Sequence, residues 1–360
     1  MREKLALYLA LAVTIAIIVP GVAFARWIPE DSGEKGIPGP QRVLVLDGSF
    51  VHNVGELHMH VGNWGNFGSW PGSANTFSEA PSAQWPAGTG IEYLFTAGLW
   101  VGALVQGVPA VSTAAFENEF RPTQDPRDII YRASEGVRGG NRRPHPNADD
   151  DGDGAIDEDR LDGFDNDGDG RVDEDFAAIS RLMFACSYTD NQPISQQIYP
   201  QHNPLNIAVR QESYQWSAPR FDDFIGVEYH ITNTGTRVLE DVYVGLLVDG
   251  DAGPRHLSNY WEDDLTARLF VPVTCTDIGP VQFDFAYTYD ADGDDGMTLG
   301  YFGVVVLDHP VHPEGLTAPR NVGFRTYNHF SGHQTFEEGG DPTNDFERYE
   351  LMSYGGSERN

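Results

Sequence analysis

Cysteine and the basic residues are both scarce in this sequence of 360 residues. Cys186 and Cys275 are the only cysteines, so the chain is not a small disulfide scaffold. The two thiols could pair in an oxidising compartment or stay free and buried, and the sequence leaves both readings open. Lysine and arginine total 23 against 54 aspartates and glutamates, which gives a formal net charge of −31. A negative field of this size argues against binding nucleic acid or an anionic membrane.

Long apolar runs and catalytic signatures are also missing. After residue 25, no segment stays apolar over the ~20 residues that a membrane-spanning helix needs. The sequence has no G-x-S-x-G, H-E-x-x-H, P-loop or C-x-x-C-H motif. We therefore predict that the chain is not an enzyme. A glycosidase remains an open alternative, because 54 acidic residues supply carboxylate pairs by chance.

The one long apolar run lies at the N-terminus and has the layout of a secretory signal peptide. A basic start at 1–4 precedes the apolar residues 5–19, and residues 23–25 give an Ala-Phe-Ala cleavage site. The pattern predicts a helical signal peptide over 1–25, and hence a secreted or cell-surface protein without a membrane span after cleavage. An uncleaved anchor is the alternative, although the run is short for one.

The mature sequence is rich in turns and in short β-type runs. Forty Gly and 23 Pro separate segments rich in β-branched and aromatic residues. In "FIGVEYHITNTG", for example, Ile225, Val227, Tyr229 and Ile231 alternate with polar residues, as in a half-buried strand. The spacing predicts an all-β protein with antiparallel β-sandwich domains. A long strand should run through 91–107, interrupted at Gly98 and Gly102, where a bulge or close packing is expected.

The composition divides the chain into six segments. We expect a signal peptide at 1–25, a flexible lead-in at 26–41, an N-terminal β-rich region at 42–135, a linker at 136–148, an acidic tandem repeat at 149–176 and a C-terminal β-sandwich domain at 177–360. Within the last segment, further strands are expected at 206–216, 267–273, 281–289, 298–308 and 321–328.

The predicted repeat holds fourteen acidic residues between Asp149 and Asp175. Shifting it on itself by sixteen residues aligns DDDGDGAIDED with DNDGDGRVDED, which makes it a tandem repeat. Charges this dense repel one another, and they can coexist if cations neutralise them. Ca²⁺ takes 6–8 oxygen ligands, and carboxylates at positions 1, 3 and 5 with Gly at position 6 wrap around one ion.

Each half of the repeat supplies such a ligand set. The first predicted loop uses Asp149, Asp151, Asp153 and the carbonyl of Ala155, and Asp157 or Glu158 would close it. The second uses Asp165, Asp167, Asp169 and the carbonyl of Arg171, closed by Asp173 or Glu174. An acidic linker that holds cations only diffusely is the alternative interpretation.

These loops resemble the calcium loops of EF-hands, dockerins and thrombospondin type 3 repeats. The resemblance covers about 30 residues and implies Ca²⁺ as the cofactor. The acidic ligand that such loops carry at position 12 is replaced by Arg160 and Phe176, and no helical pattern flanks the loops. More broadly, "YLFTAGLWVGA" and "VEYHITNTGTRVLEDVYVGLLVDGDAG" resemble large secreted bacterial surface proteins, many of them type IX secretion substrates. That resemblance implies a surface location and a β-rich build.

A third acidic stretch, "YDADGDDG", places Asp290, Asp292 and Asp294 at alternate positions between two predicted strands. It could hold a third calcium ion or form an ordinary acidic hairpin turn. Together these patterns predict a calcium-stabilised structural or adhesive protein of the bacterial surface, with cell-surface or matrix glycans or proteins as partners.

The alternative function is a secreted carbohydrate-binding or carbohydrate-active protein. Frequent aromatic residues support it, because they could form a stacking platform for sugars. The set is Trp64, Phe67, Trp70, Trp85, Tyr93, Phe95 and Trp100.

Overall fold

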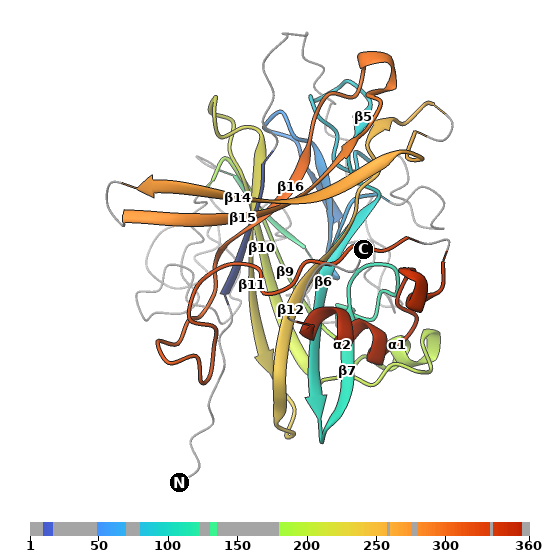
Figure 1. The fold of residues 1–360 in the computed structure, drawn as a ribbon, viewed down its shortest axis with the longest axis vertical. Helices are drawn as coiled ribbons and strands as arrows, with labels where there is room; N and C mark the ends of the chain where they lie inside the picture. Colours follow the sequence, from blue (N-terminus) through green and yellow to red (C-terminus); the bar gives the residue numbers. More distant parts are fainter. Residues whose placement is uncertain are drawn as a thin grey trace, which may run out of the picture.

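The computed structural model describes residues 10–16, 49–69, 80–122, 130–134, 180–257, 260–275, 279–331 and 334–354. The lead-in, the linker and the calcium-binding repeat that the sequence predicts lie outside these residues. The described part is an all-β protein built on antiparallel sheets (Figure 1), as the sequence predicts.

The larger sheet has eight strands in the order β14-β15-β16-β1-β11-β10-β9-β8. Its strands are β1 (Ala10–Ala16), β8 (Tyr131–Ser134), β9 (Leu182–Thr189), β10 (Ile207–Gln215), β11 (Phe224–Asn233), β14 (Asp264–Cys275), β15 (Gly279–Asp290) and β16 (Phe302–Asp308).

The second sheet runs in the order β12-β6-β4-β3-β2, with β7 also paired to β6, and a short β5–β13 pair lies apart. Its strands are β2 (Ser49–His52), β3 (Met59–Gly62), β4 (Asn66–Phe67), β6 (Thr96–Val105), β7 (Val108–Thr113) and β12 (Leu239–Asp249), and the short pair is β5 (Ile91–Glu92) with β13 (Gly253–Pro254).

The hydrophobic core lies between the two sheets. Ile225, Val227, Tyr229 and Ile231 of β11 are buried in it, as their alternation predicts. The ring of Phe50 in β2 stacks on that of Phe184 in β9, with centroids 5.0 Å apart. The two sheets therefore form a sandwich with a shared core.

The two β-rich regions of the sequence interleave in this sandwich. β12, from the predicted C-terminal domain, pairs with β6 from Leu239 opposite Val105 to Asp249 opposite Thr96, with a register shift between Glu240 and Tyr243. The sheets thus mix strands from both regions, which the segment boundaries do not anticipate. The reason is that the buried faces of the two regions complete each other rather than closing separately.

The glycines of β6 mark close packing, as the sequence predicts. A Cβ at Gly98 would lie 2.8 Å from the backbone nitrogen of Ala115, and one at Gly102 would lie 3.1 Å from Met352 Sδ. The expected interruption of the strand at these glycines is wrong, because β6 continues without a break through both positions. The expectation of a strand at 321–328 is wrong, because these residues are irregular. They lie along the hairpin instead, where Phe324 N donates to Asp284 Oδ2.

Two α-helices and two 3₁₀ turns complete the described elements. They are α1 (Pro193–Ile198), α2 (Asp345–Ser353), η2 (Asp294–Gly296) and η3 (Phe336–Glu338). Asn344 caps α2 by accepting hydrogen bonds from the backbone N–H groups of Phe346 and Glu347. Tyr349 and Met352 then pack in one cluster with residues of β6, β7 and β12, and Figure 1 shows α2 beside these strands.

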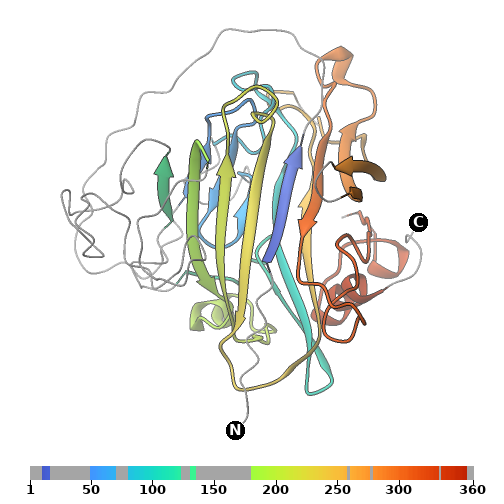
Figure 2. The same cartoon turned by 90° about the vertical axis from the view of Figure 1, so that its left-hand side faces the viewer.

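Residues Ala10–Ala16 form strand β1, whereas the sequence analysis expects a signal-peptide helix there. β1 is antiparallel to both neighbours, and Val13 lies opposite Val227 of β11 and Val306 of β16. Val13, Thr14 and Ile15 are β-branched and favour strands. Because β1 lies between two strand edges, the backbone N–H and C=O groups on both of its sides find hydrogen-bond partners. Figure 2 shows this blue strand between the yellow β11 and the orange β16.

The two cysteines lie on different strands of the larger sheet, Cys186 on β9 and Cys275 at the end of β14. Six strand positions separate β9 from β14, or roughly 29 Å at ~4.8 Å per strand. A disulfide between them is excluded at that separation. The thiol of Cys186 is buried.

Candidate metal site and buried polar network

The open end of the β14–β15 hairpin gathers carboxylates. Asp264, the first residue of β14, lies opposite Asp290, the last residue of β15. Asp263 precedes β14, and Asp292 follows β15 in a tight turn in which Gly293 has a φ of 73°. Carboxylate oxygens of Asp263, Asp290 and Asp292 lie within 4.8 Å of one another.

Hydrogen bonds within the turn fix the orientation of these carboxylates. Oδ1 of Asp290 accepts from the backbone nitrogens of Asp292, at 3.0 Å, and Gly293, at 2.8 Å. Oδ2 of Asp263 also accepts from the backbone nitrogen of Asp292, at 3.1 Å.

The other oxygen of Asp290 is an unpaired buried acceptor. Asp290 is only 7 % exposed, and its Oδ2 has no hydrogen-bond partner. A buried carboxylate oxygen without a partner carries a desolvation cost that a bound cation would remove. This atom distinguishes the site from an ordinary acidic turn, whose carboxylates point into water.

Burial first, and then repulsion among the carboxyls, raises the pKa values of these groups. Burial, together with the nearby carboxyl of Asp294, raises the pKa of Asp290 to about 6. Burial and the charges of Asp251 and Asp290 raise the pKa of Asp264 to about 8. Burial and Asp249 raise the pKa of Asp251 to about 7. The cluster therefore has too little positive charge close by.

The geometry suits a hard cation with oxygen ligands. Two ligand oxygens on opposite sides of a Ca²⁺ ion, each at about 2.4 Å from it, are separated by about 4.8 Å. The separations among Asp263, Asp290 and Asp292 fall within that limit. The three side chains could therefore ligate one ion, with further oxygens from the turn or from water.

The sequence prediction for this site named two of these three residues. Asp290 and Asp292 come together in a group with Asp263, and the carboxyl of Asp294, the third predicted ligand, lies beside that of Asp290 without belonging to this group. Its Oδ2 accepts from Thr298 Oγ1 at 2.9 Å. Asp263 replaces it, and the strand pairing that brings it to the site joins residues far apart in the chain. The predicted ligands between Asp149 and Glu174 lie outside the described residues.

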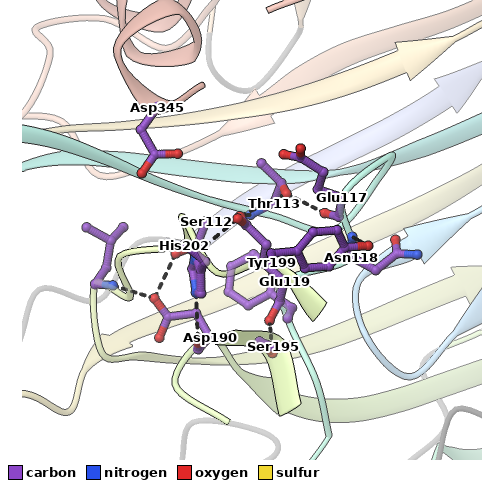
Figure 3. Close-up of polar contacts among 12 residues, drawn as sticks. Ser112, Thr113, Glu117, Asn118, Glu119, Asp190, Ser195, Tyr199, His202 and Asp345 are labelled. Atoms are coloured by element: carbon purple, nitrogen blue, oxygen red, sulfur yellow. Dashed lines mark hydrogen bonds and ion pairs between the residues drawn. The ribbon is translucent and has the colours of Figure 1, made fainter. Parts of the chain in front are cut away.

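A second polar cluster lies at the other end of the sandwich and is shown in Figure 3. Its core is Ser112 on β7, Glu119, Asp190 after β9 and His202, all of them buried. The carboxylate of Asp190 accepts from Ser112 Oγ at 2.7 Å and from the backbone nitrogens of Leu205 and Ile207.

His202 bridges two segments of this polar cluster. Its Nδ1 lies 3.1 Å from Glu119 Oε1, and its Nε2 contacts the backbone oxygen of Asp190 at 2.8 Å. Burial lowers the pKa of His202, but Glu119 and the Asp190 carbonyl outweigh this effect, so the net pKa is raised.

Ser, His and Asp are the residue types of a hydrolytic triad, but their connections differ from one. Ser112 bonds to the carboxylate of Asp190, so the imidazole of His202 does not contact the hydroxyl as it does in a triad. All of these groups are also buried, which leaves no access for a substrate. The network joins loops and is a structural element.

Ser112→Ala should therefore affect stability. Removing one hydrogen bond to a buried carboxylate should cost about 1.5–3 kcal/mol in free energy of unfolding, measurable by urea denaturation. Ser353→Ala is the matched control, because its hydroxyl makes one long exposed bond, 3.4 Å to Glu350 O. An effect on Ser112→Ala no larger than that of the control would contradict the structural role.

The aromatic residues of the proposed sugar platform are mostly in the core. Trp64, Phe67, Tyr93 and Trp100 are each at most 6 % exposed. Buried rings cannot stack on a sugar, so these four residues offer no such platform.

No described helix has the length and apolar character needed to cross a membrane. Comparisons with protein-family models, with curated proteins and with solved structures found no match.

Proposed function

We propose that this chain is a secreted, calcium-stabilised structural or adhesive protein of the bacterial cell surface. The observation that carries the proposal is the unpaired, buried Oδ2 of Asp290 beside the carboxylates of Asp263 and Asp292. The sequence adds two loops of calcium-ligand spacing between Asp149 and Glu174. The apolar N-terminus supports export, and extracellular fluids supply the ion.

In this role, calcium acts as a crosslink in the fold. At the hairpin, one ion would join the residue before β14 to the end of β15 and to the turn that follows. In the repeat, ions would order an acidic segment between strands that share a sheet. A protein stabilised in this way resists unfolding outside the cell without disulfides. The buried aromatic residues give no support to the carbohydrate-binding alternative.

The substitution Asp290→Asn tests whether Asp290 is a metal ligand or an acidic residue without that role. Asparagine keeps an oxygen for the bonds from Asp292 N and Gly293 N but removes the charge. In chelator, the variant should melt at a higher temperature than the wild type, because repulsion with Asp264 and Asp294 is lost. In the presence of calcium, the wild type should have the higher melting temperature, since the ion stabilises it more than it stabilises the variant.

The control for Asp290→Asn is Asp308→Asn, which removes an exposed charge at the end of β16. It should leave the calcium-induced shift in melting temperature unchanged. An Asp290→Asn protein with the same calcium shift as the wild type would refute a metal site at this hairpin.

A further inference from the structure

β1 occupies a position that no other described strand can fill. β11 and β16 are each paired to β1, and they are not paired to each other. β1 thereby joins β14-β15-β16 to β11-β10-β9-β8 (Figure 2). Without it, the larger sheet would consist of two separate parts.

β1 also lies in the segment that the proposed export would remove. Cleavage near Ala25 would leave two facing strand edges with unpaired backbone N–H and C=O groups. It would also uncover apolar side chains that are at most 8 % exposed in the structure. These side chains are Ile225, Val227 and Tyr229 of β11 and Phe302, Val304 and Val306 of β16.

An open strand position of this kind binds another strand strongly. Main-chain hydrogen bonds form on both sides, and alternate apolar side chains enter the core. The structure already shows the kind of occupant that fits, an extended apolar segment of seven residues antiparallel to both neighbours.

One segment of the mature sequence outside the described residues has this pattern. Residues 42–48 read RVLVLDG, with four consecutive apolar residues, two of them β-branched valines, and no proline. The lead-in at 26–41 contains three prolines, and the repeat at 149–176 is acidic throughout. Neither suits a central strand.

The connection to β2 is too short for residues 42–48 to occupy the strand position between β11 and β16 in their own copy. β2 begins at Ser49, and Phe50 stacks on Phe184 of β9. In the larger sheet, β9 lies three strand positions from β1. At ~4.8 Å per strand and ~10 Å between the two sheets, the gap left by β1 lies ~17 Å from β2. Two residues, Asp47 and Gly48, link Leu46 to Ser49 and span only ~10 Å.

We propose that, in the processed protein, residues 42–48 of a second copy occupy the strand position between β11 and β16. Each copy then donates one strand and accepts one. The contact is head-to-tail, and it builds open chains or rings. The inference depends on removal of residues 1–25, which N-terminal sequencing of the exported protein tests separately.

The test compares the mass of residues 26–360 in solution, by light scattering after size exclusion, with and without a competing strand. The competitor is a synthetic peptide of Ala10–Ala16. Wild type alone should have a mass of two or more chains, and molar excess of the peptide should reduce it to one chain. The double variant Val43→Asp/Val45→Asp should also have the mass of one chain.

The matched control is Val238→Asp, because Val238 is 74 % exposed in the turn between β11 and β12; its oligomers should persist. A wild-type protein with the mass of one chain would overturn the proposal. Oligomers that resist both the peptide and the double variant would overturn it as well. Calcium uptake by the same samples is independent of these outcomes and tests the proposed function.

Discussion

Phe184→Ala is expected to lower the free energy of unfolding by about 3–5 kcal/mol, as for other large-to-small changes at buried aromatic residues. Phe184 is 2 % exposed and stacks on Phe50 of the facing sheet. His52, which lies on β2 with Phe50, packs edge-on against the ring of Phe184, with ring centroids 4.6 Å apart. The substitution thus opens a cavity at the contact between β9 and β2, where the two β-rich regions of the sequence meet.

Urea denaturation measures this loss, and Phe346→Ala is the control because Phe346 is 62 % exposed on α2. The control should change the free energy of unfolding by about 0.5 kcal/mol or less. If the two regions were separate domains, Phe184→Ala would shift one of two unfolding transitions. A shared core predicts that a single transition moves as a whole.

Removal of calcium should have the second large effect. A site filled at a hundred times its dissociation constant contributes about 2.7 kcal/mol to stability, so three such sites contribute on the order of 8 kcal/mol. Chelation should therefore lower the melting temperature and speed proteolysis near Arg142 and Arg143. Asp151→Ala with Asp167→Ala should reproduce part of the effect in excess calcium.

The calcium effect should depend on pH with a defined sign. The pKa of Asp290 is raised to about 6 and that of Asp264 to about 8, so the folded protein holds these protons more tightly than the unfolded chain. The stability of the metal-free protein should then fall as pH rises from about 4 to about 8. Calcium should raise the melting temperature more at pH 8 than at pH 5. An equal rise at both values would contradict this assignment of the ligands.

The local features of the fold are predictable from the sequence, and the pairing of distant segments is not. The alternation of Ile225, Val227 and Tyr229 predicts β11 and its buried face, because side chains of a strand alternate between faces. Gly98 and Gly102 predict close packing in β6. No local pattern predicts that β12 pairs with β6, since this depends on which apolar faces complete each other.

The same distinction holds at the candidate metal site. Asp290 and Asp292 share one turn, so their spacing alone indicates a possible ligand set. Asp263 reaches the site because β14 pairs with β15, which joins residues 27 positions apart (263 to 290). The segment at 321–328 has apolar residues but lies along the hairpin without joining a sheet, and its side chains serve tertiary contacts instead.

Calcium titration calorimetry on residues 26–360 tests the central claim most directly. The wild type should bind three ions, two in the repeat between Asp149 and Glu174 and one at the β14–β15 hairpin. Asp290→Ala should bind two, and Asp151→Ala with Asp167→Ala should bind one. A wild-type protein that takes up no calcium, or an Asp290→Ala variant that binds as many ions as the wild type, would contradict the account.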